Sequence, residues 1–264
     1  MVMPPNAAHA EPPTDESPSQ GWSSDDLAQS PHADAHKAEK VRSMFGAIAK
    51  RYDLNNRLHS FGRDQAWRRR AVRAAEVRAG DAVLDMACGT GDLTLLLAKT
   101  SDATRVVGGD FTPEMLAIAR EKNTHGKIEY EQADAMDLPF AAKEFNALTI
   151  AFGIRNVTDP AKALTEFHRV LKPGGRLVIL EFATPPSKLV RAGNSFYTKC
   201  VMPLTAGLIA RDRTGAYRYL PRSIETFLQP PAMIEAMENA GFTDVSAHPM
   251  TFGVCVCYRG YRAG

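Results

Sequence analysis

The stretch that decides the fold is residues 84–95, LDMACGTGDLTL, in which two glycines one residue apart separate two apolar runs. This order is typical of a strand that turns tightly into a helix. Glycine tolerates the turn and lets backbone N–H groups approach a ligand with no side chain in the way. Several kinds of cofactor bind at such turns, so the stretch predicts a ligand site without identifying the ligand.

Apolar strands and helical stretches alternate along the chain on both sides of this turn. The expected strands are AVLDMA (82–87), RVVGGD (105–110), KIEYEQAD (127–134), FNALTIAF (145–152) and RLVILEF (176–182). This alternation predicts an α/β fold with a mainly parallel sheet. The last two strands, TDVSAHPM (243–250) and GVCVCYRGY (253–261), follow one another closely and are expected to form an antiparallel hairpin at the end of the chain.

The first part of the chain differs from the rest in composition. Residues 1–40 carry two lysines and seven acids, which leaves a charge of +7 for the remainder, and they hold six of the 17 prolines. Such a segment buries too little apolar surface to offset its chain entropy. We expect a disordered tail over 1–38 and a single domain over 39–264, with lid-like helices at 39–78 and an insertion at about 184–222.

The four cysteines and the apolar runs exclude two classes of protein. Cys88, Cys200, Cys255 and Cys257 are too few and too unevenly spaced for a disulfide framework or a zinc site. No apolar run reaches the roughly 18 residues that a membrane-spanning helix needs. The sequence therefore predicts a cytoplasmic protein with no metal site.

Acids at three successive strand ends narrow the choice of ligand. Asp85 and the turn Gly89, Thr90 and Gly91 follow the first strand, and Asp110 ends the second, where a carboxylate can accept both hydroxyls of a ribose. Asp134 and Ala135 end the third strand, where they suit an adenine ring. A dinucleotide site would need a third glycine at position 94, which is Thr94, so an adenosine without a pyrophosphate fits better. A tight turn and helix caps remain the alternative explanation.

This arrangement resembles the class I S-adenosylmethionine-dependent methyltransferases, and more specific motifs narrow the resemblance. YDLNN (52–56), SFG (60–62), Trp67, FGIRNV (152–157), RVLKPGG (169–175) and YRYL (217–220) look like the ubiquinone/menaquinone biosynthesis C-methyltransferase family, from about Val41 to Arg262. The resemblance implies a Rossmann-like seven-stranded sheet and S-adenosyl-L-methionine bound by the residues named above. The chain departs from the family pattern at Asn55 (usually methionine), His59 (usually apolar), Asp64 (usually histidine) and Ala151 (commonly serine).

The implied reaction is C-methylation of a polyprenyl quinol, and it needs no metal. Arg155, just after the fourth strand, is the first candidate for stabilising the ring oxyanion, because a fixed cation there faces developing charge. An ion pair with an acid such as Asp159 is its structural alternative. Tyr52 is the second catalytic candidate, with core packing as its alternative, and His59 is a weaker third.

The acceptor and the partners stay less defined. The C-terminal stretch Thr251-Phe252-Gly253 favours demethylmenaquinol over the demethylated ubiquinol precursor. Apolar residues of the insertion beside cations suit an isoprenoid tail or a peripheral contact at the inner face of the membrane. They are Phe196, Tyr197, Val201, Met202, Leu204, Leu208 and Ile209, flanked by Lys199, Arg211 and Arg213.

The sequence leaves alternative functions and an oligomeric assembly open. The six arginines of residues 63–78 fall largely outside the apolar helix face around Trp67, so we expect a solvated surface and no nucleic acid. A homodimer is one option for assembly. The alternative functions are a methyltransferase for another small molecule or RNA and, third, a dinucleotide-dependent oxidoreductase.

Overall fold

The sheet of the computed structural model contains seven strands in the order β3-β2-β1-β4-β5-β7-β6, and the structure describes residues 21–28, 30–202 and 215–264. β1 (Ala82–Met86), β2 (Arg105–Asp110), β3 (Ile128–Gln132), β4 (Phe145–Ala151) and β5 (Leu171–Phe182) are parallel to one another. β6 (Phe242–Met250) and β7 (Cys255–Arg262) form an antiparallel pair, with β7 against β5. The predicted Rossmann-like α/β fold and its C-terminal hairpin are confirmed.

Helices cover both faces of the sheet because each buries one apolar face. α4 (Arg63–Ala74) and α5 (Asp92–Thr100) pack on one face, where Trp67, Ala71, Leu93 and Leu97 join the core. α7 (Pro160–Val170) and α11 (Pro230–Asn239) cover the other face. α6 (Pro113–Lys122) packs beside β2 and β3.

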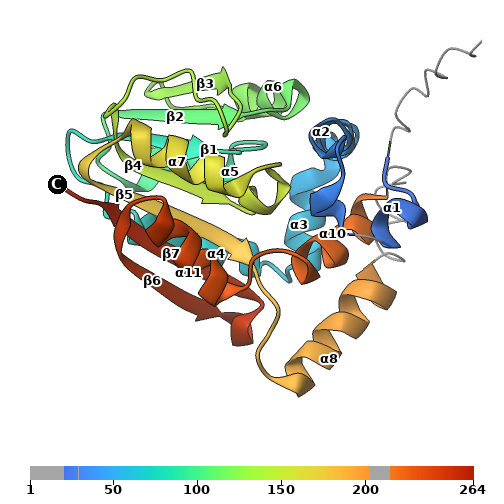
Figure 1. Cartoon of the computed structure of the whole chain (residues 1–264). Coiled ribbons are helices and arrows are strands. Elements are labelled where there is room, and N and C mark those ends of the chain that lie inside the picture. The colour runs from blue at the N-terminus through green and yellow to red at the C-terminus, as the bar shows by residue number, and fades with distance from the viewer. Residues whose placement is uncertain (1–20, 29, 203–214) are drawn as a thin grey trace, which may run out of the picture.

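The remaining helices gather at the end of the sheet where the parallel strands terminate (Figure 1). They include the lid helices α2 (Lys37–Ile48) and α3 (Tyr52–His59), then α8 (Lys188–Phe196) and α10 (Ala216–Glu225). Short elements complete this end, namely α1 (Ser24–Ala28), η1 (Pro31–Ala33), η2 (Ala49–Arg51), η3 (Ile154–Asn156) and the π-helical turn η4 (Tyr197–Val201). η5 (Thr251–Gly253) joins β6 to β7.

The prediction that all of residues 1–38 are disordered is wrong for the part that the structure describes. Trp22 is buried and its ring stacks on Tyr219 at 4.6 Å between centroids. Lys40 on α2 forms ion pairs with Asp26 at 2.9 Å and Asp34 at 2.8 Å. One aromatic anchor and paired charges therefore attach a polar segment that has little apolar periodicity of its own. Residues 1–20 lie outside the described residues.

Within the described ranges, none of the helices has both the length and the apolar character needed to cross a bilayer.

Candidate functional site

Two adjoining cavities lie at the carboxyl ends of the parallel strands. The first, named here the sheet-end cavity, is lined by the segments that follow β1, β2, β3 and β4 and by residues of α2 and α3. The second, the lid cavity, is lined mainly by α2, α3, α4, α8, η4 and α10. Phe45, Tyr52 and Phe152 line both, so ligands in the two cavities would contact the same three aromatic side chains.

Asp110 is fixed at the edge of the sheet-end cavity by backbone donors. Its Oδ2 accepts a hydrogen bond from the Gly89 N–H and its Oδ1 accepts one from the Thr112 N–H, both at 2.8 Å. Burial raises the pKa of Asp110, and these two N–H groups oppose the shift because they stabilise the carboxylate. Each carboxylate oxygen keeps acceptor capacity for a ligand hydroxyl.

The third strand end, next to that of Asp110 in the sheet, also lines this cavity. Asp134 and Ala135 both line it, and the Asp134 Oδ1 accepts a hydrogen bond from the Met136 N–H at 2.9 Å. Phe111 and Met136 add apolar surface beside the carboxylate. This combination of one acid and apolar neighbours can accommodate a flat ring that carries an amino group.

Four of the seven predicted cofactor residues, Gly89, Asp110, Asp134 and Ala135, therefore line one cavity. Their binding of a cofactor remains a prediction. The turn requires glycine at position 91, because Gly91 has a φ of +83° and an added Cβ would lie 2.5 Å from the Tyr130 hydroxyl oxygen.

Asp85, the fifth of these residues, is buried beneath the turn and is not among the side chains that line either cavity. Its Oδ2 accepts from the Thr94 hydroxyl at 2.6 Å and its Oδ1 from the Thr149 hydroxyl at 2.7 Å. Burial raises the pKa of Asp85 to about 6. The carboxyl thus joins α5 to β4, and Thr94 uses its hydroxyl where a dinucleotide motif would have glycine.

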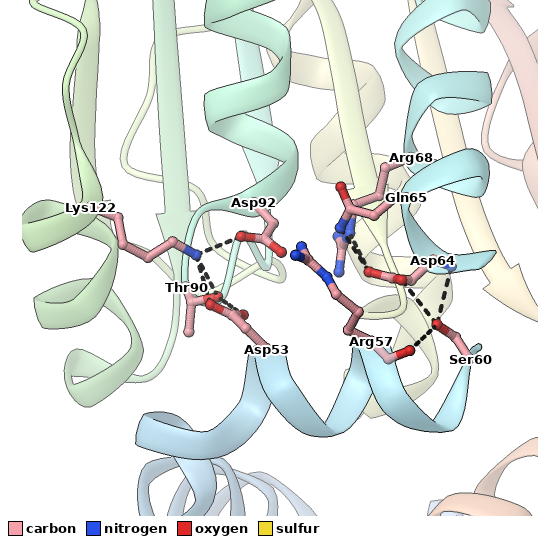
Figure 2. Close-up of polar contacts among 9 residues, drawn as sticks. All are labelled: Asp53, Arg57, Ser60, Asp64, Gln65, Arg68, Thr90, Asp92 and Lys122. Carbon is pink, nitrogen blue, oxygen red and sulfur yellow. Dashed lines mark hydrogen bonds and ion pairs between the residues drawn. The ribbon is translucent and has the colours of Figure 1, made fainter. Parts of the chain in front are cut away.

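Thr90 faces the lid rather than the cavity. Its hydroxyl donates to the Asp53 carboxylate at 2.5 Å, and Asp53 also pairs with Lys122 at 2.8 Å. Lys122 makes a second ion pair with Asp92 at 2.5 Å. Figure 2 shows these four side chains meeting between α3, the glycine turn and α6. We call this group the lid latch, because it attaches the helix that covers the cavity to the turn beneath it.

Arg155 lines the lid cavity, but it is already paired. Its Nη1 lies 2.8 Å from the Glu181 Oε1 and also donates to the Phe152 carbonyl at 2.6 Å. Both side chains of this ion pair are buried. The predicted alternative partner, Asp159, instead caps α7 by accepting from the Lys162 N–H at 3.0 Å. An oxyanion role for Arg155 must therefore use a guanidinium whose charge Glu181 largely balances.

Tyr52 and His59 also line the lid cavity from α3. Tyr52 packs edge-on against Phe45 at 5.8 Å, and burial raises its phenol pKa, so it stays protonated at neutral pH. It is therefore suited to donating a hydrogen bond and not to accepting a proton. The His59 Nδ1 lies 2.8 Å from the Asn55 carbonyl oxygen, which fixes the orientation of the ring.

Sequence reasoning did not place three polar residues in the wall of the lid cavity: Asn55, Asp64 and Arg68. Asn55 and Asp64 were noted only as departures from the family pattern. Asp64 accepts from the Ser60 hydroxyl at 2.9 Å, and its Oδ2 lies 4.0 Å from the Arg68 Nε (Figure 2). The expected solvated surface holds for Arg63, Arg69, Arg73 and Arg78, which are exposed, but Arg68 is buried. Helical spacing could have found this wall, because Asp64 and Arg68 lie on either side of Trp67 on the inward face of α4.

The insertion contributes Tyr197 and Met202 to the wall of the lid cavity. Phe196 is exposed, as predicted for a surface contact, and the Phe61 ring lies 5.5 Å from Tyr197. Among the remaining predicted contact residues, Lys199 forms an ion pair with Glu225 at 2.7 Å. Five others lie outside the described residues: Leu204, Leu208, Ile209, Arg211 and Arg213.

Comparison with known proteins agrees with this geometry. Residues 33–262 match the ubiE/COQ5 methyltransferase family. A Thermus thermophilus protein named demethylmenaquinone methyltransferase is 50% identical over 221 residues, which are 83% of this chain and 100% of that protein. A Geobacter sulfurreducens protein named ubiquinone/menaquinone biosynthesis C-methyltransferase UbiE is 44% identical, covering 86% and 90% of the two chains.

Solved structures support the fold in the same way. A SAM-dependent methyltransferase from Aquifex aeolicus aligns with a TM-score of 0.58 at 17% identity, covering 83% of this chain and 98% of that one.

Proposed function

The chain belongs to the ubiE/COQ5 methyltransferase family, and we propose that it transfers a methyl group from S-adenosylmethionine to a ring carbon of a polyprenyl quinol. Demethylmenaquinol is the first candidate acceptor and the demethylated ubiquinol precursor is the second. The name of the relative that is 50% identical supports the first candidate. Family membership removes the oxidoreductase alternative.

The observation that carries the proposal is the pair of adjoining cavities with three shared aromatic walls. A methyl transfer needs donor and acceptor side by side, in line and shielded from water. The sheet-end cavity fits the donor, because Asp110 offers acceptor oxygens for ribose hydroxyls and Asp134 one for an adenine amino group. S-adenosylmethionine supplies an electrophilic methyl group on a sulfonium.

The lid cavity fits the acceptor ring. Its walls include the aromatic group Trp67, Phe152 and Phe182, whose ring centroids lie 4.6 to 6.0 Å apart. Such walls suit a flat ring with an apolar tail, and polar groups on α3, α4 and Arg155 are available to orient the ring.

The residues of the lid cavity would favour the phenolate form of the ring, which makes its carbon nucleophilic. Arg155 and Arg68 provide positive charge near the ring, while Tyr52 can donate a hydrogen bond. Asp64 is the carboxylate in this wall and can accept the hydroxyl proton. After the methyl group has left sulfur for the ring carbon, the hydrogen on that carbon would leave as a proton and the ring oxygen would regain one, which restores the aromatic quinol. We assign Arg155 as the first residue to stabilise the oxyanion, with Tyr52 beside it.

We also propose a peripheral membrane contact for loading the acceptor. Large apolar side chains are exposed on α3, on α8 and on the turn before α4, close to residues that line the lid cavity. These apolar groups suit insertion into a lipid interface from which a polyprenyl tail enters. The exposed residues are Leu54, Leu58, Phe61, Leu189 and Phe196.

Turnover with two acceptors tests the proposal. Radiolabelled S-adenosylmethionine is supplied with short-chain demethylmenaquinol or the demethylated benzoquinol, and label in the extracted quinone is counted. We expect label in at least one of the reduced acceptors. We also expect the Asp110→Ala protein to lose affinity for S-adenosylmethionine. Unlabelled acceptors together with stoichiometric binding of S-adenosylmethionine would favour a methyltransferase for another small molecule or RNA.

A further inference from the structure

The lid cavity contains a buried amide with no hydrogen-bond partner in the described part of the protein. Asn55 on α3 is 2% exposed, and neither its Nδ2 nor its Oδ1 is paired. Among the described residues, seven buried side-chain atoms lack a partner, and four of them belong to cavity residues. These four are the two amide atoms of Asn55 and the Nε atoms of Arg68 and Arg155. Unpaired polar atoms are therefore concentrated where the acceptor would bind.

An unpaired buried amide is costly, so its retention indicates that a ligand satisfies it. Both atoms of the Asn55 amide are unpaired, so exchanging the assigned oxygen and nitrogen would not change this reasoning. Its backbone carbonyl is held in place by His59, 2.8 Å away. Asn55 stands where the family pattern has methionine, so it adds a donor and an acceptor that methionine would lack.

We propose that Asn55 binds a hydroxyl of the reduced acceptor ring and thereby distinguishes the quinol from the oxidised quinone. This inference rests on the proposed function and deepens it. A hydroxyl can donate to the amide oxygen and accept from an N–H, whereas a quinone carbonyl can only accept. Bound quinone would leave the amide oxygen unpaired, as it is in the ligand-free protein, so quinone gains one hydrogen bond fewer than the quinol and binds less tightly.

Arg68 strengthens the same preference. Its Nε is buried and has no hydrogen-bond partner among the described residues, and the nearest carboxylate oxygen of Asp64 lies 4.0 Å away. A guanidinium N–H in the same cavity as Asn55 can donate to a ring oxygen, and this hydrogen bond strengthens as the oxygen becomes negative. The two side chains together would select the ring that can react, because only the reduced ring is a carbon nucleophile.

Paired binding measurements test this assignment. The protein is saturated with S-adenosylhomocysteine, and the dissociation constants of 1,4-naphthohydroquinone and 1,4-naphthoquinone are measured anaerobically by calorimetry. In the unmodified protein we expect the quinol to bind more tightly. In Asn55→Met the quinol loses two hydrogen bonds and the quinone one, so quinol affinity should fall by about tenfold more than quinone affinity. In Asn55→Asp, which keeps an acceptor and loses the donor, discrimination against quinone increases.

Two controls keep the result interpretable. Ile48→Val removes one methyl group from the same cavity and should move both constants by a similar factor. The thermal midpoint of ligand-free Asn55→Met should equal or exceed that of the unmodified protein, because two unpaired polar atoms are removed. A purely structural role for Asn55 predicts a lower midpoint instead.

The outcomes separate this inference from the proposed function. Methyl transfer to quinols with an unchanged quinone-to-quinol ratio in both Asn55 variants would overturn the inference alone. No transfer to any quinol by the unmodified protein would overturn the proposed function and the inference with it.

Discussion

The lid latch makes a quantitative prediction about binding of the methyl donor. Asp53 accepts one hydrogen bond from the hydroxyl of the buried Thr90. It also forms an ion pair with Lys122, whose side chain is 29% exposed. A hydrogen bond to a carboxylate contributes about 1.5 kcal/mol and a partly exposed ion pair about 0.5 kcal/mol. Asp53→Ala should therefore favour lid opening by about 2 kcal/mol, or roughly thirtyfold in the opening equilibrium.

The consequence is a faster release of ligand from the sheet-end cavity, since α2 and α3 line it. We expect the dissociation constant of S-adenosylmethionine, measured by calorimetry, to rise up to about thirtyfold in Asp53→Ala, mainly through the dissociation rate in stopped flow. Asp53→Asn keeps an acceptor for Thr90 and loses only the ion pair, so a change of about two- to threefold is expected.

Glu121→Ala is the matched control, because it removes an exposed charge next to Lys122 on the same helix. It should leave both the affinity and the dissociation rate unchanged. Equal effects of Asp53→Ala and Glu121→Ala would refute the latch, as would an Asp53→Ala protein that releases S-adenosylmethionine at the normal rate.

Three further predictions concern buried groups. Because the folded-state pKa of Asp85 is raised from 3.8 to about 6, its contribution is favourable below pH 4 and is lost as pH rises through 6, by about 3 kcal/mol. In urea unfolding, the free energy of unfolding of Asp85→Asn minus that of the unmodified protein should be larger at pH 8 than at pH 4. Equal differences at the two pH values would contradict this. Glu181→Gln leaves the buried Arg155 without its counter-charge, so calorimetry should show a loss of about 3 kcal/mol, and an unchanged midpoint would argue against the pair. Trp22→Ala should lower the free energy of unfolding by about 3 kcal/mol if its stacking anchors the N-terminal segment, whereas a loss near zero would mean that the segment contributes nothing to folding.

The parts of the fold that were predictable are those encoded locally. The strands around Val83 and Leu148 are apolar runs, and both residues are fully buried where the runs predicted. The meeting of Asp110 and Asp134 at one cavity was also predictable, because parallel strands bring their carboxyl ends together and these acids follow two of them. Their binding of an adenosine remains a prediction.

Long-range pairing accounts for what the sequence did not reveal. Trp22 is buried against residues distant in the sequence, including Tyr219, on which its ring stacks, so an average over the tail composition could not detect it. Arg155 pairs with Glu181, which lies on the neighbouring strand β5. It does not pair with Asp159, which is closer in the sequence and caps α7. Arg68 belongs to an arginine-rich run, and only the packing of α4 decides which arginine of that run is buried.

The position of the transferred methyl group tests the account most directly. The protein is incubated anaerobically with S-adenosylmethionine carrying a ¹³C-methyl group and short-chain demethylmenaquinol, and the extracted product is examined by carbon NMR. The account predicts a ¹³C-methyl group on a ring carbon, formed from the reduced acceptor and absent when the oxidised quinone is supplied. A methyl group on oxygen, or no transfer to the quinol while S-adenosylmethionine binds normally, would contradict it.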